Sequence, residues 1–120
     1  MNNSVLKDRS YNFALRIIKL TQKLPKNIAC DSLAKQLIRY ATSLGANVEE
    51  AQDCFTKKDF THKMSLAIKD ARESKYWLNL VKDTALLYDQ EVNQLIQEAE
   101  ELSRKLKYIE KTSEKNIKKL

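Results

Sequence analysis

The chain contains one glycine, Gly45, and one proline, Pro25, among its 120 residues. Turns and loops use both residue types heavily, so a chain with so few of them has room for few loops. Charged residues make up 32% of the sequence, with both signs interspersed. This pattern is typical of long helices with a solvated face. The length suits a single domain, which we expect to span 1–120.

Apolar residues recur at steps of three and four in four segments, and this spacing predicts four helices. We expect them at Leu6–Leu24, Asp31–Phe55, Lys57–Ala85 and from Asp89 to Lys115 or beyond. No segment shows the alternation of a strand. Four helices joined by short loops pack as sequence neighbours. The sequence therefore predicts an all-α fold, an antiparallel up-down-up-down four-helix bundle.

Several residues mark where these helices begin or pack closely. Asp31 and Asp89 are expected N-caps, because a carboxylate can accept a hydrogen bond from a first-turn amide. Thr56 and Asp59 have the spacing of a capping box. Gly45 lies on one face with an alanine one turn earlier, which favours close approach of a neighbouring helix; the alternative is a tolerated weak point.

The two cysteines, Cys30 and Cys54, lie near opposite ends of the second predicted helix. A rise of about 1.5 Å per residue separates them by roughly 36 Å, whereas a disulfide needs Cα atoms within about 7 Å. We therefore expect free thiols in a reducing compartment. No apolar run approaches the roughly 18 residues of a membrane span, and the N-terminal residues lack a signal-peptide core. A cytoplasmic location without membrane contact is expected.

Residues suited to catalysis or metal binding are sparse. His62 is the only histidine, and a di-iron bundle needs Glu-x-x-His on each of two helices. The cysteines lack zinc spacing, and no set of nucleophile, base and orienting group is visible. A glycine-rich phosphate loop is excluded by the single glycine. The sequence predicts a non-enzymatic protein with no metal and no cofactor.

The second and third predicted helices carry a cluster of four carboxylates: Glu49, Glu50, Asp70 and Glu73. They could form a polar site between the helices. The interpretation that we favour is a set of ordinary ion pairs. In it the first two meet Arg39, Lys63 or a neighbouring chain, and the last two meet partners one turn away on the third helix.

The net charge is +6, and basic residues follow one face of the fourth predicted helix. Antiparallel packing would bring the end of this helix to the start of the first. The candidate nucleic-acid-binding residues are Lys7, Arg9, Arg16, Arg104, Lys107, Lys111, Lys115 and Lys118. Such a positive end could hold a phosphate backbone, or it could be a solubilising surface matched to the helix dipole. Only Tyr11 and Tyr108 offer stacking faces nearby, which does not support sequence-specific RNA readout.

The third predicted helix has a second apolar flank formed by Leu66, Trp77 and Leu80. These residues could pack on another helix of the same chain. We favour the alternative, an interface with a second subunit, because apolar aromatic patches mark such interfaces.

Three stretches, residues 42–51, 58–64 and 67–78, together with the opening Arg9-Ser10-Tyr11 and Phe13-Ala14, carry a resemblance. The chain resembles, from Arg9 to Leu106, a small bacterial four-helix bundle family named after proteins encoded in 23S rRNA intervening sequences. The motifs S-x-G-A-N-x-E-E-A and E-x-x-Y-W-L are specific. Asp70 stands where a glutamate is common, and Leu44 where an isoleucine is common.

The resemblance implies a homo-oligomer, commonly a pentamer with a central channel, and no enzymatic activity. It also implies similarity to the accessory variability determinants of diversity-generating retroelements, basic pentameric barrels that assist a reverse transcriptase and bind nucleic acid. The leading hypothesis is a non-enzymatic oligomeric bundle that binds RNA or DNA electrostatically, with a reverse transcriptase-like protein as a further candidate partner. The alternative is a protein–protein adaptor or structural assembly protein with no nucleic-acid role.

Overall fold

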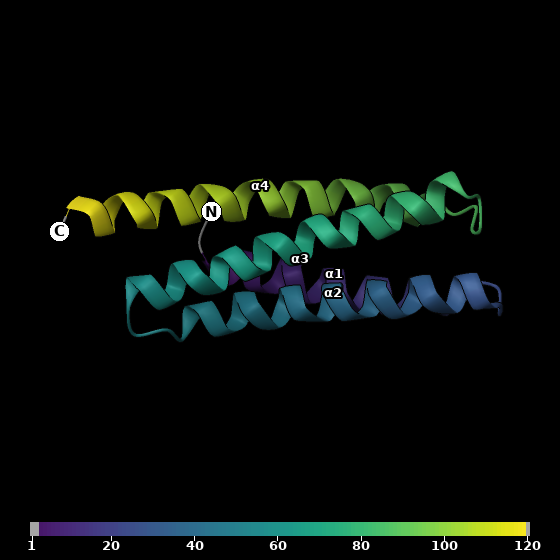
Figure 1. Cartoon of the computed structure of the whole chain (residues 1–120), viewed down its shortest axis with the longest axis horizontal. Helices are drawn as coiled ribbons and strands as arrows, with labels where there is room; N and C mark the ends of the chain where they lie inside the picture. Colours follow the sequence, from purple (N-terminus) through teal and green to yellow (C-terminus); the bar gives the residue numbers. More distant parts are fainter. Residues whose placement is uncertain (1–2, 120) are drawn as a thin grey trace.

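The computed structural model describes residues 3–119, with side chains over 4–113. Its helices are α1 (Asn3–Thr21), α2 (Ile28–Gln52), α3 (Lys57–Asp83) and α4 (Gln90–Lys119). Each helix runs antiparallel to the next, and α4 returns beside α1 (Figure 1). The diagonal pairs, α1 with α3 and α2 with α4, bring no Cα atoms within 8 Å of each other in the described range. The predicted all-α antiparallel four-helix bundle is confirmed.

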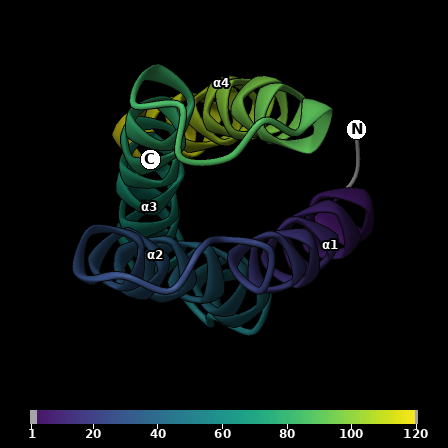
Figure 2. The same cartoon turned by 90° about the vertical axis from the view of Figure 1, so that its right-hand side faces the viewer.

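The apolar stripes of the four helices meet in one core along the bundle. Phe13, Leu44, Leu78 and Leu102 are fully buried, one from each helix. Burying a large apolar side chain contributes about 1.5–3 kcal/mol, so this stripe supplies most of the driving force for packing. Seen from the end, the ribbons of α1 and α4 stand further apart than those of the other neighbouring pairs (Figure 2).

The turn between α1 and α2 differs from the prediction. The helix α1 ends at Thr21, and the amide of Leu24 donates to the Thr21 carbonyl at 3.2 Å in a tighter turn. Leu24 precedes Pro25 and avoids the α conformation, so the helix cannot continue beyond this turn. The prediction that Asp31 caps α2 was wrong: Asn27 is the N-cap and accepts from the Cys30 amide at 2.8 Å.

The turn between α2 and α3 corrects a second assignment. The helix α2 ends at Gln52, so Phe55, predicted as part of the apolar seam, lies in the turn and is fully exposed. The chain must reverse within four residues, and the cap at Thr56 needs extended backbone, so Phe55 cannot continue the helix. The Thr56 hydroxyl accepts from the Asp59 amide at 3.1 Å, which confirms the hydroxyl half of the predicted capping box.

The end of α3 is closed by a residue with unusual backbone geometry. Ala85 has φ of 56°, the left-handed region. Its amide donates to Lys82, and the next amide, of Leu86, donates to Val81. These two bonds form a Schellman motif, which stops α3 at Asp83 instead of the expected Ala85. Asp89 then accepts from the Glu91 amide at 2.8 Å, as expected for the cap of α4.

Gly45 lies where α1 crosses α2. A Cβ atom added at Gly45 would lie 3.5 Å from the carbonyl oxygen of Ser10 on α1. Ser10 is itself buried. The predicted close approach of a neighbouring helix is confirmed, and the helix concerned is α1.

Candidate functional site

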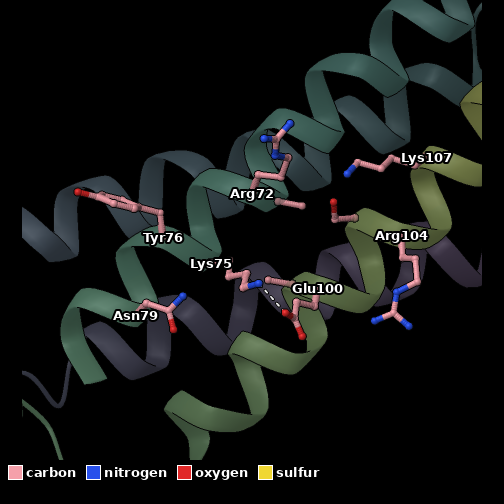
Figure 3. A pocket seen from close by; sticks show the side chains of 10 residues that line it. Arg72, Lys75, Tyr76, Asn79, Glu100, Arg104 and Lys107 are labelled. Atoms are coloured by element: carbon pink, nitrogen blue, oxygen red, sulfur yellow. Dashed lines mark hydrogen bonds and ion pairs between the residues drawn. The ribbon is translucent and has the colours of Figure 1, made fainter. Parts of the chain in front are cut away.

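A groove of about 490 Å³ lies between α3 and α4 and opens to solvent (Figure 3). Three small buried residues, Ala71, Ala99 and Ser103, are part of its lining. Small side chains at these positions leave space between the two helices, which longer residues would fill. The groove is therefore a direct product of the sequence at the α3–α4 contact.

The two helices contribute matching sets of polar residues to this groove. From α3 come Arg72, Lys75, Tyr76 and Asn79, and from α4 come Glu100, Ser103, Arg104 and Lys107. Both sets have the spacing i, i+3, i+4 and i+7, which places each set on one face of its helix. Four basic side chains therefore share the groove with a single carboxylate.

The carboxylate of the groove is engaged by one of these cations. Lys75 Nζ lies 2.5 Å from Glu100 Oε1. This hydrogen bond, together with the positive charge of Lys75, lowers the pKa of Glu100. In Figure 3, Arg72 and Lys107 lie towards one end of the groove, and Asn79 lies towards the other. The Tyr76 ring extends from α3 on the side away from α4, and Arg104 also points away from the groove. Arg72 and Lys107 make no ion pair with a side chain in 4–113.

Part of the predicted basic set meets in this groove. Arg104 and Lys107 line it, and Lys111 is exposed one turn further along α4. The side chains of Lys115 and Lys118 lie outside the described ones. Sequence reasoning missed Arg72 and Lys75, although their spacing on the third helix was visible, because spacing alone does not reveal which helix a face meets.

The three predicted cations of α1 lie elsewhere, each beside an acid. Lys7 lies 3.8 Å from Glu49. Two donors of Arg9 reach the Glu98 carboxylate, at 3.1 and 2.5 Å, and this contact raises the pKa of Arg9. Arg16 pairs with Glu91.

These pairs follow from the lengths of the helices. With 19 residues against 30, α1 lies beside the acidic first half of α4 and not beside its basic end. The three α1 cations are therefore not brought to the groove, and their charge is largely balanced.

Asp70 forms a polar contact between α2 and α3, which was the less favoured of the two interpretations of the acidic cluster. Its carboxylate is buried and accepts from the Ser43 hydroxyl at 2.7 Å and the Asn47 amide at 2.9 Å. Burial raises the pKa of Asp70, while these two hydrogen bonds lower it less. The expectation of a partner on its own helix was wrong, because Asp70 lies on the α3 face that meets α2.

The other three acids of the cluster are less buried. Glu50 pairs with Lys63 at 3.0 Å, as the sequence predicted. Glu49 meets Lys7, and Glu73 makes no ion pair within residues 4–113. A shared acidic site is therefore absent from the described side chains.

The predicted interface residues Leu66, Trp77 and Leu80 are all half-buried. Trp77 packs against the core of its own chain. Its indole Nε1 is buried without a hydrogen-bond partner among the described residues. The Tyr76 and Trp77 rings meet edge to face, with centroids 5.0 Å apart and planes at 84°.

The described residues form neither a cluster of metal ligands nor a membrane-spanning helix. Within residues 4–113, no three His, Cys, Asp or Glu side chains gather as they would around a metal ion. None of the described helices combines the length and the apolar character that crossing a bilayer requires. Cys30 and Cys54 are free thiols, as predicted.

Comparisons with known proteins give two findings. A sequence model of the family described as 23S rRNA-intervening sequence protein matches residues 2–108. The chain is also similar to a crystal structure from Bacteroides thetaiotaomicron VPI-5482, a protein with unknown function from the S23 ribosomal protein family. The two share 32% identity with a TM-score of 0.80, over 92% of this chain and 99% of the other. A comparison with curated proteins finds no match.

Proposed function

Given that the chain belongs to the 23S rRNA-intervening sequence protein family, we propose that it is a non-enzymatic protein that binds RNA or DNA electrostatically through its α3–α4 groove. The observation that carries the proposal is the gathering of Arg72, Lys75, Arg104 and Lys107 around one groove with a single carboxylate. Several basic residues elsewhere in the bundle are paired with acids, as at Arg9 and Arg16.

The physical basis is the release of counterions from a polyanion. Each phosphate neutralised by a lysine or arginine frees condensed cations, which favours binding at low salt. Arg72 and Lys107 enter the groove with no ion pair to a described side chain, so a phosphate need not displace a carboxylate from them. Binding of this kind requires no catalytic group, and the only histidine, His62, is exposed on α3 outside the groove.

The proposal includes self-association and a protein partner. The family resemblance supports a homo-oligomer, a pentamer in its commonest form, and a reverse transcriptase-like protein as a partner. The half-buried flank of Leu66, Trp77 and Leu80 is the surface that we assign to the subunit contact. A cytoplasmic location is part of the same proposal.

A protein–protein adaptor is the second candidate, and exposed apolar residues on the other side of the bundle favour it. Tyr11 and Leu15 on α1 are 62% and 40% exposed, and Ile38 on α2 is 38% exposed. A protein partner could cover them. A partner captured after nuclease treatment and lost on Tyr11→Ala with Leu15→Ala, in a chain that binds no nucleic acid, would favour the adaptor.

The test is a fluorescence anisotropy titration with labelled RNA and DNA oligonucleotides from about 50 to 200 mM salt. We expect binding at low salt that weakens steeply as salt rises. The double variant Arg72→Gln with Lys107→Gln should lose most of it. Lys19→Gln with Lys35→Gln is the matched control, since both lysines are exposed and lie on α1 and α2. This double substitution removes the same charge as the groove variant. No binding at low salt, or equal loss in the control, would contradict the proposal.

A further inference from the structure

Tyr76 affects which kind of nucleic acid the groove can bind. The residue is 54% exposed and lines the groove beside Arg72, Lys75 and Asn79. Tyr108 is also exposed, but it does not line the groove. The structure thus adds an aromatic face next to basic residues, which sequence reasoning had sought at Tyr11 and Tyr108.

The exposed ring has a rigid support. Trp77 meets Tyr76 edge to face at 5.0 Å and itself packs against the core. An aromatic ring held in this way loses little freedom when a second flat group stacks on it. Asn79, one turn from Tyr76, also lines the groove and supplies an amide donor and an acceptor.

We propose that the groove binds single-stranded RNA or DNA, with phosphates at Arg72 and Lys107 and a base stacked on Tyr76. This rests on the proposed function and narrows its ligand. Proteins that bind single strands combine a basic groove with aromatic faces on which bases stack. A duplex keeps its bases paired and stacked inside, so it offers no free base face to Tyr76. A charged surface alone would take duplex and single strand alike.

The experiment compares labelled single strands of uridylate and of thymidylate, about 12 nucleotides long, with RNA and DNA duplexes of the same length. We expect the single strands to bind more tightly than the duplexes. Tyr76→Leu should weaken single-strand binding about fivefold or more, the loss expected for one stacked base, and leave duplex binding unchanged. Tyr76→Phe should restore it, because the ring is kept.

Tyr11→Leu is the matched control, because Tyr11 is similarly exposed at 62% and lies on α1, outside the groove. It should bind like the native chain. A second readout needs no variant: Trp77 is the only tryptophan and touches Tyr76, so single strands should change its fluorescence. A labelled heparin fragment, a polyanion without bases, should leave that fluorescence unaltered.

Each outcome decides between the two proposals. Equal affinity for strands and duplexes, an unaltered Tyr76→Leu variant, or no response from Trp77 would overturn the single-strand inference while leaving electrostatic binding intact. Absence of binding to every probe would overturn both. Tighter binding of the single strands than of the duplexes, lost in Tyr76→Leu, would support the inference, and a difference between the RNA and DNA strands would identify the sugar that the groove favours.

Discussion

The hydroxyl of Ser43 on α2 donates to the carboxylate of Asp70 on α3 at 2.7 Å. Asn47 donates to the same oxygen. Gly45, between these two donors in sequence, packs against the backbone of α1. The S-x-G-A-N stretch therefore contacts α1 on one side and α3 on the other. Its specificity of sequence is explained by packing and hydrogen bonding between helices, with no catalytic role needed.

Replacing Asp70 tests how its burial affects stability. Burial raises its pKa above the usual 3.8. Because the folded-state pKa is then higher than the unfolded-state value, stability is lost as the pH rises through the interval between them. The native chain should therefore lose stability as the pH rises from about 4 to 7, and Asp70→Asn should not. The free energy of unfolding of Asp70→Asn minus that of the native chain should accordingly increase over this range.

Urea denaturation at several pH values measures this difference. Asp8→Asn, at an exposed position of α1, is the control for the loss of one carboxylate. Asp70→Ala should cost about 1–3 kcal/mol, because the Ser43 and Asn47 donors lose their acceptor. If the free energy of unfolding of Asp70→Asn minus that of the native chain decreased with rising pH, the raised pKa of Asp70 would be contradicted.

Gly45 should tolerate one methyl group and no more. A Cβ there would make an ordinary contact with Ser10 at 3.5 Å, while alanine removes the entropic penalty of a mid-helix glycine. Gly45→Ala should raise the free energy of unfolding by about 0.5–1 kcal/mol. Gly45→Leu should lower it by about 1–3 kcal/mol through overpacking against α1. Destabilisation by alanine would show that α1 lies closer than the structure has it.

Ala85 should be improved by glycine, because its φ of 56° is strained for a residue with a side chain. Ala85→Gly should raise the free energy of unfolding by about 1 kcal/mol. The same substitution at Ala46, exposed within α2, is the control and should lower it by about 1 kcal/mol. Thermal denaturation of the two variants should thus give shifts of opposite sign.

Glu100 should oppose the binding of polyanions. It is the only carboxylate of the groove and occupies Lys75 at 2.5 Å. Glu100→Gln frees Lys75 and should tighten binding of single strands by about two- to fivefold. The plot of log affinity against log salt should become steeper by about 0.7 for the added phosphate contact. Glu49→Gln, which frees Lys7 outside the groove, should change neither quantity.

The subunit contact predicts a mass above that of one chain. Light scattering should give a multiple of 14.0 kDa, five-fold if the pentamer of the family resemblance applies. Leu66→Glu should dissociate the assembly while leaving the helical circular dichroism intact, since Leu66 is only half-buried in its own chain. A native mass of 14.0 kDa at micromolar concentration would refute the contact. Unfolding by Leu66→Glu would place this side chain in the core instead.

Helix assignments from the sequence succeeded where a repeating pattern carried them. The three-and-four spacing around Leu44 and Leu78 identified helices because burial of one face imposes that period. Helix ends were less accurate, as at Asp31 and Phe55. Local side chains compete to cap a helix, and Asn27, four residues before the expected cap Asp31, accepts from the Cys30 amide. A short turn then displaced Phe55 from the helix.

The sequence by itself determined four antiparallel helices, free cysteines and basic residues late on α4, because each of these features depends on the spacing of residues within one segment. Only the tertiary structure decided which faces meet. It set Arg72 and Lys75 opposite Lys107, gave Arg9 and Arg16 to the acids of α4, and buried Asp70 against Ser43. The reason is physical: period and polarity are properties of one helix, whereas a groove or a buried hydrogen bond depends on how two helices are rotated and shifted against each other.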